Sequence, residues 1–230
     1  ENGRVTGIIV KDQFMPCDAV IVSQDTLRAV DDLFEVPLKE KWIDWLKTSI
    51  TPEGNMFVCL GVKMDLKDYP KAWIIPTEKP FEAGGLTFNE LRFNNYATYE
   101  GHAPEGCSTI TCLLLGDSYQ YWKDAKADGT YLAKKKEITA RFIEELNKHI
   151  PGLKENVEVT DFATPLTYER YCSSYQGSWM SVWATKDKMY TLPAKSKTVK
   201  GLYFEGQRTS MPGGLPIALN SAYKAVQNLC

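Results

Sequence analysis

Residues 201–222 read GLYFEGQRTSMPGGLPIALNSA, and this stretch is the most informative part of the chain. A short apolar strand, Leu202–Phe204, stops before Gly206, and a loop rich in proline and glycine follows it. The loop leads into a helix whose first turn carries Pro216, a residue whose fixed φ suits the start of a helix. The stretch therefore predicts a strand, a flexible loop and a helix in close succession.

Such a junction can hold an electron-rich or anionic group. Glycine lets a ligand approach the backbone closely. The N-terminus of a helix presents unpaired N–H groups and carries about half a positive charge, so an anion is stabilised there. An ordinary connection between a strand and a helix explains the same residues equally well, and the residues alone leave both interpretations open.

The rest of the chain predicts an α+β fold with a mostly antiparallel sheet and helices packed on one face. Residues 55–64 alternate between apolar and other side chains and give the clearest strand signal. Further strands are expected at residues 4–11, 18–22, 72–75, 94–98, 109–115, 157–162, 179–184 and 202–204, with turns at 11–13 and 84–85. Helices are expected at residues 24–34, 38–48, 132–150, 164–171 and 216–229. Strands and helices do not alternate regularly, which argues against a doubly wound fold.

Composition limits the class of protein. The chain has 230 residues, 43% of them hydrophobic, which is enough for one large domain or two unequal ones. The net charge is −2 with both signs spread along the chain, so we expect no nucleic-acid partner. No apolar run approaches the ~18 residues of a membrane span. Six cysteines without a C-x-x-C pair predict free, buried thiols in a reducing compartment, and hence a cytoplasmic location.

The chain carries no complete motif for metal, phosphate or acyl chemistry. His102 and His149 are the two histidines, and the sequence pairs neither with a nucleophile. No group of ligands has the spacing of a metal site, so we expect no metal. Neither G-x-G-x-x-G nor a P-loop motif occurs. No catalytic residue is identified from the sequence.

Residues 201–222 resemble the C-terminal flavin motif of the phytoene desaturase, carotenoid isomerase and retinol saturase family, which belongs to the flavin amine-oxidase superfamily. In that family a run of the form G…PGxGxP…S closes over the isoalloxazine ring. The match departs at Met211-Pro212-Gly213, where the first proline is displaced by one residue, and at Glu205, where many relatives have a small residue. The resemblance implies cofactor-binding roles for Gly206, Gly213, Gly214, Leu215, Pro216 and Ser221.

Other segments, earlier in the chain, resemble the same family in the same order. Residues 3–9 and 18–23 are similar to the hairpin and strand that end its flavin domain. APEG at residues 103–106 resembles a turn before a core strand, and ATPLTYERY at residues 163–171 resembles the start of a helix. YQGS at residues 175–178 matches the loop after that helix.

The resemblance implies that the chain is the substrate side of an FAD-dependent oxidoreductase. Residues 1–33 and 197–230 would be pieces of the flavin domain, and residues 34–196 the substrate-binding domain. The segment with the glycine fingerprint that holds the FAD pyrophosphate would be a partner that this chain lacks. The chain begins at Glu1 without a methionine, so we expect a piece of a longer polypeptide that retains no FAD and is inactive by itself.

For the parent enzyme, the resemblance implies hydride transfer or isomerisation on a polyene or another long apolar substrate. Tyr168, Arg170, Tyr175 and Trp179 are the candidate substrate-binding residues. Packing in the core is the alternative for each aromatic residue, and a surface position or a structural ion pair is the alternative for Arg170. The resemblance to enzymes with long apolar substrates leaves peripheral membrane contact open. The sequence itself shows no basic amphipathic helix strong enough to predict such contact.

Two other functions remain open. The chain could be a binding module for an apolar ligand or a partner protein, derived from such an enzyme and without catalysis. It could also be part of an amine oxidase, although the APEG and ATPLTYERY segments favour the desaturase and isomerase branch.

Overall fold

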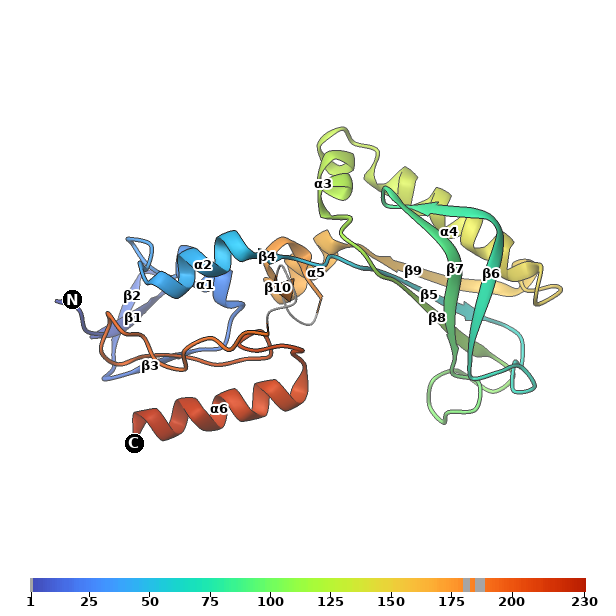
Figure 1. Cartoon of the computed structure of the whole chain (residues 1–230). Coiled ribbons are helices and arrows are strands. Elements are labelled where there is room, and N and C mark those ends of the chain that lie inside the picture. The colour runs from blue at the N-terminus through green and yellow to red at the C-terminus, as the bar shows by residue number, and fades with distance from the viewer. Residues whose placement is uncertain (1, 180–182, 185–188) are drawn as a thin grey trace. The chain divides into compact units, whose positions relative to one another are not determined.

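The computed structural model describes residues 2–179, 183–184 and 189–230. The chain divides into two compact units: unit 1 comprises Glu1–Glu53 and Glu169–Cys230, and unit 2 comprises Gly54–Tyr168. Unit 1 thus holds both ends of the chain, and unit 2 holds its middle (Figure 1). The predicted limits at 33/34 and 196/197 separate pieces of a flavin domain from a substrate-binding domain. They stay a prediction, because the two compact units are defined by packing and not by what each part binds.

Unit 2 is built on a five-stranded antiparallel sheet with the strand order β6-β7-β8-β5-β9. Its strands are β5 (Met56–Val62), β6 (Ala72–Ala83), β7 (Leu86–Asn95), β8 (Ser108–Leu114) and β9 (Val157–Ala163). Gly84 and Gly85 form the predicted turn between β6 and β7, with φ of 60° and 76°. Both angles lie in the left-handed region that a tight hairpin turn requires and that glycine adopts without strain.

Helices cover one face of this sheet. They are α3 (Tyr119–Ala127), α4 (Tyr131–Asn147) and the single turn η1 (Lys154–Asn156), and Figure 1 shows α4 lying along the sheet. Apolar side chains of α4 are buried against alternate residues of the strands, among them Met56, Val58, Leu60 and Val62 of the strand expected at residues 55–64; Met64, the next alternating position, lies beyond β5 and is partly buried. The predicted fold class, α+β with a mostly antiparallel sheet and helices on one face, is confirmed.

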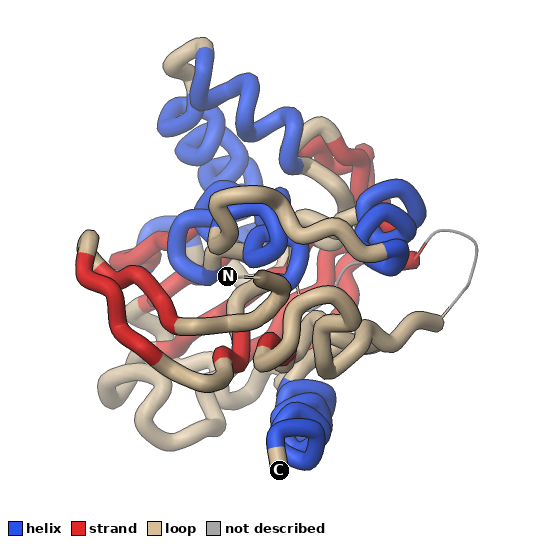
Figure 2. Tube along the Cα trace, turned by 90° about the vertical axis from the view of Figure 1, so that its left-hand side faces the viewer, coloured by secondary structure: helices blue, strands red, loops and turns tan. Residues whose placement is uncertain are grey.

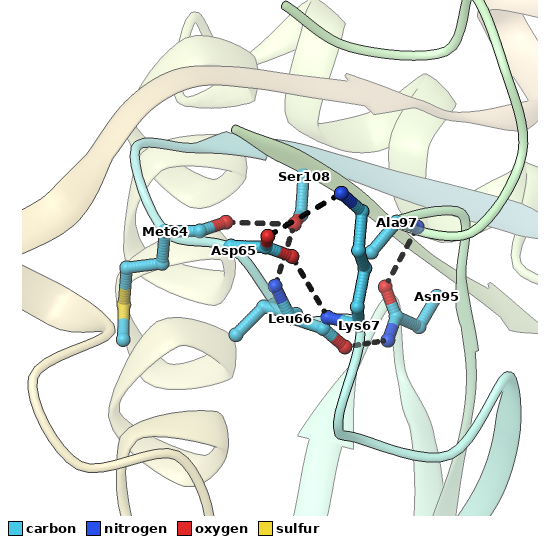
Figure 3. A network of polar contacts seen from close by, with 7 residues as sticks. All are labelled: Met64, Asp65, Leu66, Lys67, Asn95, Ala97 and Ser108. Atoms are coloured by element: carbon cyan, nitrogen blue, oxygen red, sulfur yellow. Dashed lines mark hydrogen bonds and ion pairs between the residues drawn. The ribbon is translucent and has the colours of Figure 1, made fainter. Parts of the chain in front are cut away.

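A buried polar network fixes the loop that follows β5 (Figure 3). The Ser108 hydroxyl donates to the carbonyl oxygen of Met64 at 2.7 Å and accepts the Leu66 N–H at 3.0 Å. The Asn95 side-chain amide donates to the carbonyl oxygen of Leu66 at 2.8 Å and accepts the Ala97 N–H at 3.1 Å. These bonds satisfy backbone groups that would be costly to bury unpaired.

The described residues of unit 1 form three small two-stranded sheets and four helical elements. A hairpin joins β1 (Gly7–Val10) to β2 (Gln13–Pro16), β3 (Val20–Val22) pairs in parallel with β11 (Leu202–Phe204), and β4 (Ile50–Thr51) pairs with β10 (Trp183–Ala184). The helical elements are α1 (Thr26–Asp32), α2 (Lys41–Ser49), the single turn η2 (Tyr175–Gly177) and α6 (Leu215–Leu229). A further helix, α5 (Pro165–Cys172), contains the boundary between the units.

A buried carboxylate joins the segment before α2 to the segment before β11. Oε1 of Glu40 accepts hydrogen bonds from the Ser196 hydroxyl, the Lys197 N–H at 3.0 Å and the Thr198 hydroxyl at 3.0 Å. Its Oε2 accepts the indole N–H of Trp42 at 2.6 Å. Burial raises the pKa of Glu40, but the hydrogen bonds outweigh it and hold the pKa below its ordinary value.

The hairpin corrects one sequence prediction. Strands were expected at residues 4–11 and 18–22 on either side of a turn, but β1 pairs with β2, and β3 pairs with β11 instead. Lys11 and Asp12 have φ of 50° and 64°, which makes a two-residue turn, so the residues directly after it become the partner strand. The side chains of β2 are all exposed, which left no alternating pattern to detect.

In unit 2, strand β7, helix α3 and the turn η1 were not predicted, and one strand was placed wrongly. The register of β6 against β7 shifts between Pro76 and Phe81, so the apolar alternation of β7 changes phase midway and loses its signal. Helix α3 buries only Trp122 and Ala125, which is too short a stripe to recognise. The strand expected at residues 94–98 ends at Asn95. Of the strand expected at 179–184, residues 180–182 lie outside the described residues.

The six cysteines form no disulfide, as expected, but Cys172 and Cys230 are exposed rather than buried. Burial raises the pKa of the Cys112 thiol to about 12. Throughout the described part of the chain, no helix combines the length and the apolar composition that crossing a membrane requires.

Candidate functional site

The carboxyl ends of β3 and β11 open onto one edge of unit 1. The two strands run in parallel, with Phe204 beside Val22, and the Glu205 N–H donates to the carbonyl oxygen of Val22 at 3.0 Å. The loops that leave the strands therefore start side by side. In open α/β sheets, ligands bind in the crevice outside the carboxyl ends of parallel strands. This edge, with the glycine-rich loop (residues 206–214) and the start of α6, is the candidate site.

Gly206 and Ser221 contact each other directly. The Gly206 N–H donates to the Ser221 hydroxyl at 2.9 Å, and that hydroxyl donates to the carbonyl oxygen of Ala218 at 2.9 Å. Gly206 has φ of 124°, and a Cβ there would lie 3.3 Å from the carbonyl oxygen of Ser23. Glycine and serine at these positions thus fasten the end of β11 to the first turns of α6. Their predicted contact with a flavin remains a prediction.

The first residues of the glycine-rich loop form a closed turn. The Thr209 N–H and the Thr209 hydroxyl both donate to the carbonyl oxygen of Gly206, at 3.2 and 2.8 Å. Thr209 is buried. The position of Arg208 is therefore set by bonds on both sides of it.

Helix α6 begins without a side-chain cap. Its N-cap is Gly214, with φ of 80°, and Gly213 before it has φ of 84°. Pro216 lies in the first turn and has no N–H, and Leu215 is 86% exposed. No side-chain cap therefore neutralises the partial positive charge of this helix end, which is part of the candidate site.

A buried ion pair joins the glycine-rich loop to the start of α1. Nε of Arg208 lies 3.0 Å from Oδ2 of Asp25, and the two side chains are 10% and 3% exposed. The other guanidinium nitrogens of Arg208 donate to the hydroxyl and the carbonyl oxygen of Ser178. Asp25 also accepts the Leu27 N–H at 3.1 Å, which caps α1, and the Tyr175 N–H at 3.0 Å. Burial lowers the pKa of Arg208, while Asp25 acts in the opposite direction.

The four predicted substrate-binding residues lie in different surroundings. Tyr175 is half-buried and packs, with Met211, against a small apolar cluster of unit 1. Trp179 is half-buried, and its N–H donates to the carbonyl oxygen of Glu53 at 2.8 Å. Tyr168 is half-buried in α5, and Arg170 is exposed there with its guanidinium 5.1 Å from the ring centre of Tyr171. The structure thus brings Tyr175 to the glycine-rich loop through Asp25 and Met211; substrate binding by these four stays a prediction.

Sequence reasoning missed Asp25, Ser178 and Arg208, which join the loops of the site. Asp25 could have been found, because an aspartate directly before a helix is a common N-cap. Nothing local marks Arg208, because its partners lie far away in the sequence. Glu205, noted as a departure from the family motif, is half-buried at the same edge, and burial raises its pKa; no ion pair reaches it within the described residues.

The residues present fit one edge of a flavin. The uncapped start of α6 suits a group that gains negative charge on reduction, and the glycines of the loop leave its backbone open to close approach. The Gly206 N–H donates to the Ser221 hydroxyl, so these two residues shape the site, and their contact with a ligand stays a prediction. Among the described residues, no group of histidine, cysteine, aspartate and glutamate side chains could hold a metal ion.

No protein-family model matches the chain, and no curated protein matches it. The solved structures that share its fold include two oxidoreductases. An oxidoreductase from Methanosarcina mazei has a TM-score of 0.54 and 17% sequence identity, with 97% of this chain and 47% of that chain covered. Cyclohexylamine oxidase from Brevibacterium oxydans IH-35A has a TM-score of 0.60 and 13% identity, with 94% of this chain and 44% of that chain covered. The chain therefore has the fold of part of these oxidoreductases and spans less than half of either length.

Proposed function

We propose that this chain is the substrate-side part of an FAD-dependent oxidoreductase of the phytoene desaturase, carotenoid isomerase and retinol saturase family. The observation that carries the proposal is the junction of β11 and α6. There the end of a parallel strand, a glycine-rich loop and an uncapped helix start come together, and Gly206 and Ser221 clamp them. The likeness of fold to two oxidoreductases supports the oxidoreductase part of the proposal.

A dinucleotide-binding segment is the proposed partner that completes unit 1. Two parallel strands seldom form a sheet by themselves, because parallel sheets are normally buried on both faces. The other side of β11 is already occupied, since the Phe204 N–H donates to the carbonyl oxygen of Ala194. The outer edge of β3 is the place for a further strand, and Ile21 of β3 is exposed.

The exposed apolar side chains of unit 1 support this partner. Helix α6 presents a stripe at helical spacing, with Leu215, Leu219 and Tyr223 86%, 77% and 63% exposed. The β1–β2 hairpin exposes Ile9 and Phe14 as well. Figure 2 shows α6 as the helix that ends at the C-terminal label, bordered by loops. Apolar patches of this kind mark contact surfaces, and a segment carrying the Rossmann glycines would bury them.

A bound flavin would supply the hydride acceptor or donor. The residues of this chain would position it: the start of α6 would face the N1–C2=O edge, and the clamp between Gly206 and Ser221 would hold that helix end in place. Tyr168, Arg170, Tyr175 and Trp179 would contact a polyene or another long apolar substrate. A cytoplasmic location, with or without contact to a membrane surface, belongs to the same proposal.

An amine is the second candidate substrate class, because one of the similar structures is a cyclohexylamine oxidase. The APEG and ATPLTYERY segments favour the polyene branch. One assay distinguishes the two substrate classes: either a polyene or cyclohexylamine is added, without oxygen, to the FAD-loaded polypeptide that includes the sequence upstream of Glu1. Bleaching of the flavin by the amine alone would replace the polyene proposal.

Flavin retention tests the proposed function directly. We expect the 230-residue chain, mixed with FAD and passed through a desalting column, to emerge without visible flavin absorbance. We expect the chain joined to the coding sequence upstream of Glu1 to retain about one FAD per protein, because the pyrophosphate then has its glycine loop. An upstream sequence without a strand and G-x-G-x-x-G, or a short chain that stays yellow, would contradict the proposal.

A further inference from the structure

Arg208 connects two parts of the candidate site that are distant in the sequence. It lies in the glycine-rich loop, and its three guanidinium nitrogens bond Asp25 and both oxygen atoms of Ser178. Asp25 in turn accepts the N–H of Tyr175. Tyr175 and Ser178 belong to the tyrosine segment (Tyr175–Trp179), which contains two of the proposed substrate residues. One side chain thus holds the loop proposed to face the flavin and the segment proposed to face the substrate.

We propose that Arg208 is a positioning residue that couples the glycine-rich loop to the tyrosine segment, so that binding of a flavin at the loop orders the substrate side of the site. The inference rests on the proposed function for the identity of the flavin. Its structural part, the coupling of the two loops, rests on the contacts of Arg208 alone.

A gain in stability does not by itself explain why the ion pair between Arg208 and Asp25 is buried. Removing two charges from water is costly, and apolar residues of similar volume often replace a buried ion pair without loss of stability. A guanidinium group does offer a rigid, planar set of donors that fixes the geometry of its acceptors. The three bonds of Arg208 use that geometry to fix Asp25 and Ser178 with respect to one another.

The hydrogen bonds continue from Arg208 to α6. Thr209, the next residue, is bonded to the carbonyl oxygen of Gly206, and the Gly206 N–H is bonded to Ser221. A contiguous path therefore runs from the helix start proposed to face the flavin, through the turn at residues 206–209, to the tyrosine segment. Coupling between two sites is reciprocal, so a ligand that orders one end of the path should order the other.

Hydrogen exchange on the 230-residue chain tests the coupling without any flavin. We expect Arg208→Met to raise amide exchange by about tenfold both in residues 206–214 and in residues 173–179, while β3 and β11 keep their protection, because only local openings become easier. Arg208→Lys should restore protection in part, since it keeps one charge-assisted bond. Arg92→Met, an exposed arginine of unit 2, is the matched control and should change neither segment. Faster exchange in residues 206–214 alone, or throughout unit 1, would overturn the coupling.

The second half of the proposal is that a bound flavin orders the tyrosine segment. It is tested on the longer polypeptide loaded with FAD. In the wild type, FAD should slow amide exchange in residues 173–179 as well as at the glycine-rich loop, and in Arg208→Met it should protect the loop alone. Equal protection of both segments in the variant would overturn the inference while the proposed function stands. A wild type that takes up no FAD would overturn the proposed function and the flavin half of the inference, while exchange on the shorter chain still decides the coupling.

Discussion

Unit 2 and unit 1 handle their apolar side chains in opposite ways. Unit 2 buries one continuous core between its five-stranded sheet and α4. Unit 1 divides its buried apolar residues between two small clusters, and most of the large hydrophobic side chains exposed in the described structure belong to it. Unit 2 therefore has a core of its own, whereas unit 1 exposes apolar side chains of the kind that mark contact surfaces.

The buried polar interactions of the two units also differ: those of unit 2 are local, and those of unit 1 join distant segments. In unit 2, Asn95 and Ser108 serve backbone groups of one nearby loop. In unit 1, Glu40, Asp25 and Arg208 are buried charged groups that tie together segments from opposite ends of the chain. A unit without a large apolar core depends more on such links, and this dependence can be measured.

The largest expected effect lies in the core of unit 2. Phe142 is fully buried and its ring centre lies 5.0 Å from that of Phe93. Phe142→Ala should lower the free energy of unfolding by about 3–5 kcal/mol, because it removes buried apolar surface and leaves a cavity. Urea unfolding measures the loss. Leu132→Ala, on the exposed side of the same helix, is the control and should stay within about 0.5 kcal/mol of the wild type. A small effect of Phe142→Ala would break the contrast between the units.

The next effect concerns unit 1. Glu40→Gln should lower the stability of unit 1 by about 1.5–3 kcal/mol, because hydrogen bonds to a charged group contribute about that much. The glutamine keeps the size of the side chain but loses the charge that Ser196 and the backbone of residues 197 and 198 surround. Hydrogen exchange in α2 and β11 reports the change. Glu35→Gln, an exposed glutamate nearby in the sequence, is the control.

The same carboxylate predicts a dependence on pH. The pKa of Glu40 in the folded state lies below its ordinary value of 4.5. Its contribution is therefore complete above that ordinary value and is lost as the pH falls through the lower, folded-state pKa. Acid unfolding of unit 1 in the wild type should steepen below about pH 4.5 relative to Glu40→Gln, which lacks this titration. If the stability of unit 1 fell equally with pH in the wild type and in Glu40→Gln, the lowered pKa of Glu40 would be contradicted.

A smaller effect belongs to the polar network of unit 2 in Figure 3. Asn95→Ala should cost about 1–2 kcal/mol, because it leaves the carbonyl oxygen of Leu66 and the N–H of Ala97 without their buried partner. Asn94→Ala, whose side chain is exposed on the opposite face of the same strand, supplies the comparison in chemical denaturation. Equal losses from both substitutions would show that the network adds nothing specific.

The smallest effect on stability should come from the stripe of α6. Leu219→Gln should change the stability of the 230-residue chain by less than about 0.5 kcal/mol, because the side chain is already in water. In the longer polypeptide the same change should weaken FAD retention, since the proposed segment would bury this position. Substantial destabilisation of the shorter chain would mean that the stripe is already packed, and the contrast between the units would need revision.

The sequence was informative where the signal repeats locally. In the strand expected at residues 55–64, the alternating residues Met56, Val58, Leu60 and Val62 are buried. In the helix expected at residues 132–150, the apolar residues Ile138, Phe142, Leu146 and Ile150 recur every four residues and are buried as well. The prediction failed where the local pattern is interrupted. The register shift opposite β7 changed the phase of its alternation, and the short stripe of α3 carried too few residues to stand out.

Some features of the candidate site could be predicted from the sequence, and others could not. The junction at residues 201–222 was visible in the sequence because a strand, glycines and a helix start follow one another there. Its supporting residues were not visible, because Asp25, Ser178 and Arg208 meet only after the chain returns from unit 2. Their roles depend on burial and on distances between residues that no local pattern encodes.

By itself, the sequence determined the α+β class, most helices and strands, and the strand–loop–helix junction, because periodicity and backbone preference act between neighbouring residues. Only the tertiary structure decided that β3 pairs in parallel with β11, that Gly206 and Ser221 clamp the helix start, and that Arg208 is buried against Asp25. Those outcomes depend on which distant segments come together, and the free energy of that choice lies in packing and in buried polar bonds rather than in any single segment.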